Sequence, residues 1–154
     1  MRLIPLPEDE APVDVPYAAA LGSLMYAAVD TRPNIAFAVQ TLSQFTVRPS
    51  AMHWTALQHV FRYLKGTLNI SITYSGNLDY EPIRFSDANW AQSQADRLSV
   101  SGYAFCLTNS LVSWLSKKQP MVVLSTMEAE YIALSHAAKE AIWLCRLLTK
   151  EPLC

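Results

Sequence analysis

The spacing of apolar residues divides the chain into a helical first part and a strand-rich second part. Over residues 17–66, apolar side chains recur every three or four positions, which is typical of helices that bury one face. From residue 70 the pattern changes to alternation with β-branched and aromatic residues, which favours strands. A helical pattern returns from residue 125 to the end of the chain. The pattern therefore predicts a mixed fold of the α+β or α/β class, with a helical first part followed by strands and one long helix.

Proline, glycine and capping residues set the expected limits of the first helices. Residues 1–16 are expected to be extended, because their prolines exclude a helix. A first helix is expected over 17–29 and a second after Pro33. A third is expected from Ser50, a good N-cap, to Gly66, a good residue to follow a helix.

The second part is expected to form an antiparallel sheet covered by one long helix. The expected helix covers about 125–149, and the short segment 108–110 is expected to be a hairpin turn. Strand-like patterns occupy four segments, 70–74, 82–86, 100–107 and 111–116. We expect the last three of these strands to lie side by side in sequence order.

Composition narrows the class of protein. Of the 154 residues, 51% are hydrophobic and 16% are charged, which predicts a packed core and excludes disorder. The net charge of -1 gives no whole-chain argument for nucleic-acid binding. Apolar runs are too short to span a bilayer, and the three cysteines have no disulfide or zinc spacing. We expect an intracellular protein without a membrane partner; cytoplasm and nucleus are not distinguished.

Two glutamates near the start of the long helix have different expected roles. Ser125 and Glu128 have the spacing of a capping box, which gives Glu128 a structural role. Glu130 belongs to the stripe that we expect to pack on the sheet, together with Leu134, Ala137 and Ala141. An acid on that face is costly unless it is compensated. Two interpretations stay open: a hydrogen-bonded acid at the rim of the core, or a metal ligand that converges with Asp87.

Long segments of the sequence resemble Pol polyproteins of copia-type LTR retrotransposons. SDANWA, DRLSVSGYAFCL, VSWLSKKQP and LSTMEAEYIALSHAAKEAIWL resemble their RNase H region. YAAALGSLMYAAVDTRPNIAFAV and HWTALQHVFRYLKGTLNISITYS resemble the end of their reverse transcriptase. After the extended segment 1–16 expected from the prolines, the resemblance implies a helical reverse-transcriptase tail over 17–69. It implies an RNase H-like domain over 70–154, truncated after its first long helix.

The resemblance also implies an activity and its ligands. RNase H enzymes cut the RNA strand of an RNA–DNA hybrid with two Mg²⁺ (or Mn²⁺) ions held by carboxylates. Asp87 matches the aspartate of the family's first strand, and Glu130 matches the glutamate of its long helix. The hybrid and the remainder of a Pol polyprotein are the implied partners.

The sequence departs from the family pattern in two places. Asn89 stands where family members commonly have aspartate, and no segment like Cys-Asp-Asn-Gln follows the long helix. We therefore expect an incomplete site with weak or absent Mg²⁺ binding, and a chain that is inactive alone. Without its parallel neighbour, strand 82–86 is expected to be an exposed edge through which the chain self-associates.

Three functional interpretations stay open. The chain is a fragment of a copia-type polyprotein that is inactive alone, an active RNase H completed by another chain or a longer precursor, or a host-retained binding or structural module without catalysis.

A few basic and aromatic residues are candidates for contacts to nucleic acid. Phosphate contacts from lysine and arginine supply affinity that does not depend on sequence. The candidates are Arg62, Lys65, Lys117 and Lys118, with Trp90 as a stacking platform. The alternative is a solvated face and a helix cap for the basic residues, and core packing for the tryptophans. The histidines show no ligand spacing and are expected at the surface or at the rim of the core.

Overall fold

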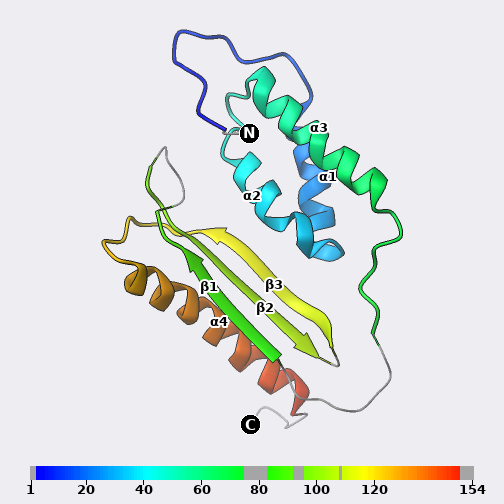
Figure 1. The fold of residues 1–154 in the computed structure, drawn as a ribbon, viewed down its shortest axis with the longest axis vertical. Coiled ribbons are helices and arrows are strands. Elements are labelled where there is room, and N and C mark those ends of the chain that lie inside the picture. Colours follow the sequence, from blue (N-terminus) through cyan, green and yellow to red (C-terminus); the bar gives the residue numbers. More distant parts are fainter. Residues whose placement is uncertain (1–2, 75–82, 92–95, 108, 150–154) are drawn as a thin grey trace. The chain divides into compact units, whose positions relative to one another are not determined.

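The computed structural model describes residues 3–74, 83–91, 96–107 and 109–149. The chain forms two compact units, Met1–Ser75 and Gly76–Cys154, each of which is described by itself (Figure 1). Within the described residues the first unit is helical and the second contains a sheet and a helix, so the chain has an α+β fold. The assignment of these units to parts of a polyprotein stays a prediction.

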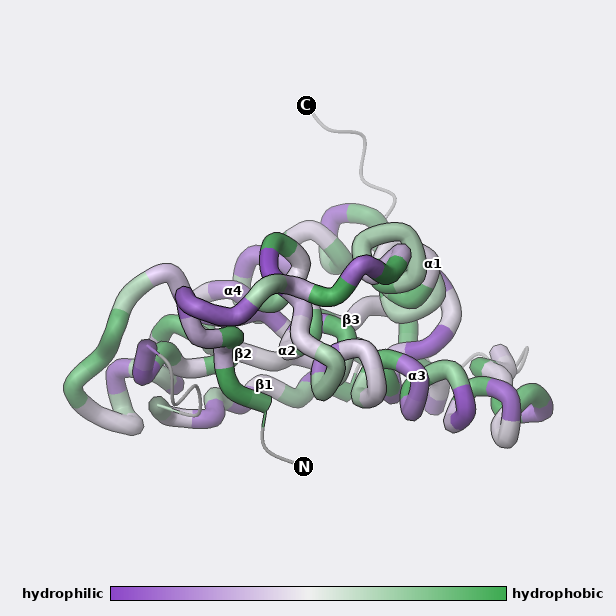
Figure 2. Tube along the Cα trace, turned by 90° about the horizontal axis from the view of Figure 1, so that it is seen from above, coloured by the Kyte–Doolittle hydropathy of each residue, from purple (hydrophilic) through white to green (hydrophobic). Residues whose placement is uncertain are grey.

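The first unit contains α1 (Tyr17–Asp30), the short 3-10 helix η1 (Pro33–Ile35), α2 (Ala36–Ser43) and α3 (Ala51–Gly66). These limits agree closely with those expected from proline and glycine, and Ser50 is the N-cap of α3 as expected. Apolar side chains from α1, η1, α2 and α3 form one core. Figure 2 shows hydrophobic colours along much of α1. Met25, Tyr26 and Val29 remain exposed on this helix.

The N-terminal segment is held to the first unit by polar contacts. Nη2 of the Arg48 guanidinium group donates to the carbonyl oxygens of Pro7, Glu8 and Glu10 at 2.8–3.2 Å. His53 is fully buried, stacks on Phe45 and lies 2.9 Å from the carbonyl oxygen of Ile4 through Nε2. The expectation that every histidine lies at the surface or rim was therefore wrong for His53.

The second unit contains β1 (Ile83–Asn89), β2 (Val100–Leu107), β3 (Ser110–Lys118) and α4 (Thr126–Leu148). The strands are antiparallel in the order β1-β2-β3, as expected, and α4 packs against β1 and β2 (Figure 1). Apolar residues on β2 and small residues on α4 are buried between the two layers, namely Phe105, Ala129, Ala133 and Ala137. The strand order and the covering helix are thus confirmed.

Three details differ from the sequence-based expectation. Residues 70–74 form no strand in the first unit. β1 continues to Asn89, three residues beyond the expected end, because pairing with β2 reaches Val100. Ser110 belongs to β3, and Asn109 before it has φ 64°, a left-handed conformation that asparagine tolerates in hairpins. Residues 82 and 108 lie outside the described residues.

Within the residues that the structure describes, none of the helices has both the length and the apolar character needed to cross a membrane.

Candidate functional site

Asp87 lies within β1 and not at its end. It is opposite Gly102 in β2, and its side chain is exposed. Only Ala88 among the β1 residues is partly buried. A carboxylate at this position is therefore hydrated and accessible to a ligand from solvent.

The pleat of β1 separates Asp87 from the face that α4 covers. Arg84 and Phe105, which are opposite each other, line a hollow together with residues of α4. Ser86 lines a second hollow with α4. Because successive side chains of a strand point to opposite faces, Asp87 belongs to the other face of the sheet. The convergence of Asp87 and Glu130 on one ion stays a prediction.

Glu130 is exposed on the flank of α4 next to β1. Together with Ser86, Met127, Tyr131 and Leu134 it lines an open hollow of about 360 Å³. Ser86 precedes Asp87 in the chain, so Glu130 lies near the part of β1 that carries Asp87. The structure thus places Glu130 next to the strand that carries Asp87. The Asp87 side chain lies on one face of the sheet, and Glu130 lies on the face that α4 covers.

The packed stripe of α4 agrees with the expected one at Ala137 and differs from it at Glu130 and Leu134. Ala129, Ala133 and Ala137 are buried against the sheet, whereas Leu134 is 55% exposed. The first half of the packed stripe is therefore shifted by one residue from the expected one, so that Glu130 and Leu134 lie at its flank, whereas Ala141 is partly buried as part of the expected stripe. The acid on the inner side is Glu140, three residues after Ala137.

Glu140 forms a polar cluster that sequence reasoning missed. The Ser113 hydroxyl donates to Glu140 Oε1 at 2.6 Å, which compensates the partly buried acid. Burial, followed by the Glu140 carboxylate, raises the pKa of Tyr103, while the Ser113 hydroxyl opposes this rise. The spacing of Glu140 from Ala133 and Ala137 was the available signal. A hydrogen-bonded acid at the rim of the core was one interpretation of Glu130. The structure has such an acid at Glu140.

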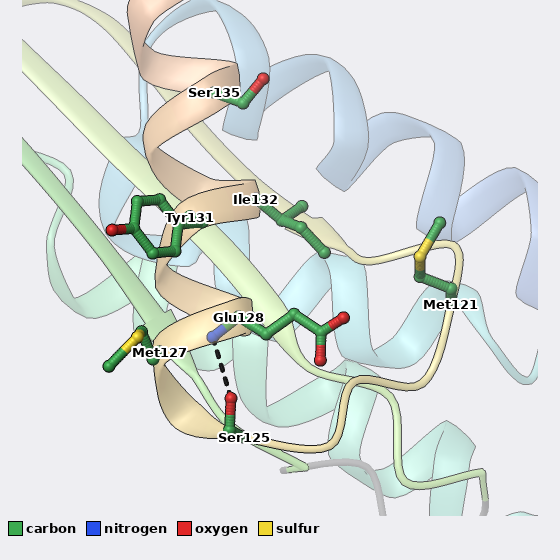
Figure 3. Close-up of a pocket in the computed structure, with 7 residues that line it drawn as sticks. All are labelled: Met121, Ser125, Met127, Glu128, Tyr131, Ile132 and Ser135. Carbon is green, nitrogen blue, oxygen red and sulfur yellow. Dashed lines mark hydrogen bonds between the residues drawn. The ribbon is translucent and has the colours of Figure 1, made fainter.

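Glu128 caps the start of α4. The Glu128 N–H donates to Ser125 Oγ at 3.2 Å, and Glu128 Oε2 accepts the N–H of Leu124 at 2.9 Å. In a capping box the Glu128 carboxylate would accept the N–H of the N-cap residue Ser125. Here it accepts the N–H of Leu124, the residue before the N-cap. Figure 3 shows the Glu128 carboxylate on the side of Met121, with Tyr131 and Met127 on the other side of α4. The structural role expected for Glu128 is confirmed.

A buried glutamine joins α4 to the sheet. Gln119 Nε2 donates to Ser101 Oγ at 2.8 Å and to the carbonyl oxygen of Ala129 at 2.9 Å. The Gln119 backbone N–H also donates to the Ser99 carbonyl oxygen at 2.8 Å. These bonds fix the first turns of α4, and with them Glu130, relative to β2. The sequence signal was weak, because glutamine after a strand is commonly exposed.

The candidate nucleic-acid contacts belong to different units. Arg62 and Lys65 are exposed on α3 in the first unit. Lys117 is exposed at the end of β3, and Lys118 forms an ion pair with Asp96 at 2.5 Å. Trp90 is 45% exposed and its indole N–H donates to the carbonyl oxygen of Val123 at 3.3 Å. The contacts themselves stay predictions.

The described part of the chain holds no group of three or more histidine, cysteine, aspartate or glutamate side chains placed to bind one metal ion.

Comparisons with known proteins define the family. The secreted RxLR effector protein 161 of Plasmopara viticola is 47% identical over 131 residues, which cover 85% of this chain and 92% of that protein. The retrovirus-related Pol polyprotein from transposon TNT 1-94 of Nicotiana tabacum is 46% identical over 87% of this chain and 10% of its own length. The corresponding polyprotein from transposon RE1 of Arabidopsis thaliana is 42% identical over 87% of this chain and 9% of its own.

No family model matches the chain, and no solved structure matches it. Its described residues define an α+β protein with an acid-bearing edge strand beside one long helix. The chain belongs to the family of retrovirus-related Pol polyproteins of copia-type transposons. It spans about a tenth of the length of the Pol polyproteins that it matches.

Proposed function

We propose that the chain is the part of a copia-type Pol polyprotein that joins the end of the reverse transcriptase to the first half of an RNase H-like domain. In this proposal residues 17–69 are the reverse-transcriptase tail and residues 70–154 begin the nuclease. The ancestral activity is metal-dependent cleavage of RNA in an RNA–DNA hybrid, and this chain alone does not perform it.

One observation carries the proposal. Glu130 lines one hollow with Ser86 of β1, the residue before Asp87, so the two acids that match the family's ligands lie near the same part of this strand, on different faces of the sheet. Family membership supplies the context for these acids. Antiparallel strands followed by a long covering helix are also the element order that the RNase H resemblance implies.

The residues suit Mg²⁺ in kind and fall short in number. Both acids are exposed carboxylates, and oxygen ligands are what a hard divalent cation prefers. Their chemistry therefore fits the ion, although the described residues contain no group of three such side chains. When bound, the metal supplies an activated water and stabilisation of the leaving oxygen. Asp87 and Glu130 would hold it beside β1, and Gln119 would keep the start of α4 in place.

The partners in this proposal are the RNA–DNA hybrid and the remainder of the polyprotein. Lys117 and Trp90 are exposed in the unit that carries the acids, and a cation and an aromatic ring suit a phosphate backbone and a base. The exposed apolar residues Met25, Tyr26 and Val29 on α1 suit burial against another part of the polyprotein.

The test is cleavage of a labelled RNA–DNA hybrid with Mg²⁺ or Mn²⁺. We expect no cleavage by this chain, and cleavage by a version extended with the segment that follows α4 in the Pol relatives. Asp87→Asn in the extended version should abolish cleavage, while Asp96→Asn, which removes a loop acid, should not. Mn²⁺ binding by titration calorimetry gives a second measurement, in which Asp87→Asn should weaken the extended version.

Two results would contradict the proposal. Cleavage by the short chain that disappears with Asp87→Asn would show that a second copy or another residue completes the site. Failure of the extended version to cleave or to bind Mn²⁺ would remove the RNase H assignment altogether.

A second function is favoured by one comparison. The effector relative is matched over 92% of its length, so a protein of nearly this extent carries another role in Plasmopara viticola. We propose a non-catalytic binding module as the alternative. Unchanged function of the chain in its own organism after Asp87→Asn and Glu130→Gln would favour this alternative over the nuclease.

A further inference from the structure

The outer edge of β1 is a strand edge with apolar side chains. β1 is the edge strand of the sheet, and the described residues place no strand beside its outer edge. Ile83 and Phe85 are 46% and 61% exposed on the face away from α4. Such an edge offers a row of backbone N–H and C=O groups to another strand.

The flank of α4 next to this edge is also apolar. Met127 and Tyr131 are each 67% exposed and line the hollow that Ser86 and Glu130 share with Leu134. An additional strand beside β1 would cover part of this hollow. The outer edge of β1 therefore has apolar side chains on both of its sides, Ile83 and Phe85 on one and Met127, Tyr131 and Leu134 on the other. We call these five residues with the strand edge the β1 edge surface.

We propose that the β1 edge surface binds a second copy of this chain. The two copies pair their β1 strands antiparallel about a two-fold axis perpendicular to the sheet, which gives one continuous six-stranded sheet. Phe85 lies opposite the partner's Phe85, and both α4 helices lie on the same face. The proposal does not depend on metal binding or on nuclease activity.

Charge complementarity favours this occupant and this register. With Phe85 opposite the partner's Phe85, antiparallel pairing sets the partner's Arg84 opposite Ser86. Ser86 and Glu130 line the same hollow on the α4 face, and Arg84 belongs to that face. In the proposed dimer the partner's Arg84 therefore lies beside the hollow that Glu130 lines and pairs with this acid, and symmetry forms the pair twice. The one ion pair found among the described residues, Lys118–Asp96, involves neither side chain.

Neighbouring registers are less favourable. A shift by one pair sets Phe85 opposite the partner's Asp87 and Arg84 opposite the partner's Ala88. A further shift sets Asp87 opposite the partner's Asp87, and like charges directly opposite each other are destabilising. The proposed register keeps Asp87 opposite the partner's Ile83 and pairs the aromatic rings, which is a favourable cross-strand contact.

The experiment is a charge swap read by sedimentation velocity on the full chain over a wide concentration range. We expect a concentration-dependent dimer of the unchanged chain. Arg84→Glu and Glu130→Arg should each raise the dimer dissociation constant by about tenfold or more, because each places like charges together. The double variant carrying both changes should restore the dimer. Lys139→Glu, a charge reversal on another flank of α4, should leave the dimer unchanged.

Two further variants distinguish this interface from the metal site and from association through another surface. Phe85→Lys should give a monomer with an unchanged circular dichroism spectrum, because the residue is exposed and not part of the core. Asp87→Asn should leave the dimer intact, so failure of the metal site and failure of this interface are distinguishable. A monomer at every concentration would overturn the proposal. A dimer that is insensitive to both single charge reversals would assign association to another surface and would also overturn it.

Discussion

Gln119 is the side chain on which the placement of α4 most depends. It is 1% exposed, and its amide group bonds β2 and α4 at once. Its Oε1 has no hydrogen-bond partner within the described residues. The bonds of Nε2 therefore offset the desolvation of a group that is not fully satisfied.

We expect Gln119→Met to lower the free energy of unfolding of the second unit by about 1–3 kcal/mol, because it strands the buried Ala129 carbonyl and Ser101 hydroxyl without their donor. Methionine has a similar volume, so the loss reports the hydrogen bonds and not a cavity. Urea unfolding followed by tryptophan fluorescence measures it. Gln58→Met on α3 is the matched control, and an equal loss there would argue against a special role for Gln119.

At the scale of elements, the limits of the helices were well predicted, because proline, glycine and capping residues act locally. Ser50 and Ser125 cap α3 and α4 as expected. The stripe that packs was predicted only in part, because Ala137 is buried as expected, whereas Leu134 is exposed and the smaller Ala129 is buried. Close packing of a helix on a sheet favours alanines, which sequence hydropathy ranks below leucine.

The residues of the candidate site stay a prediction, and their geometry did not follow from the sequence. The resemblance identified Asp87, which lies within β1, and Glu130, which lines a hollow with Ser86 of the same strand. The direction of the Asp87 side chain follows from the register of β1 with β2, which no local pattern encodes. Glu140 was missed for the same reason as the stripe.

The N-cap of α4 gives a prediction for this element. We expect Ser125→Ala to lower the free energy of unfolding of the second unit by about 1 kcal/mol, since it removes the acceptor of the Glu128 N–H. Ser135→Ala on the exposed side of the same helix should have little effect. Thermal unfolding of the two variants by circular dichroism measures the difference. Equal midpoints for the two would show that water replaces the cap at no cost.

At the scale of the whole molecule, the first unit contains a buried histidine whose protonation affects its stability. In the first unit His53 is fully buried and its pKa is lowered from 6.5 by burial, with the Ile4 carbonyl opposing this shift. His53 Nδ1 accepts the Ser50 backbone N–H at 3.0 Å, so the neutral ring carries its proton on Nε2 and donates to Ile4. Protonation of Nδ1 removes this acceptor at the start of α3.

The first unit should therefore lose stability in acid. The unfolded chain binds a proton at His53 near pH 6.5 and the folded unit binds it only at lower pH, so unfolding takes up a proton between these values. The contribution of neutral His53 is fully present above pH 6.5 and is lost progressively as the pH falls below it. Hydrogen exchange of α3 and of residues 3–15, compared about one pH unit above and below this value after correction for intrinsic rates, measures the loss.

His53→Gln should flatten this pH dependence, whereas His59→Gln, at an exposed histidine on the same helix, should retain it. Equal protection of α3 at both pH values in the unchanged chain would show that the folded unit accepts the protonated ring.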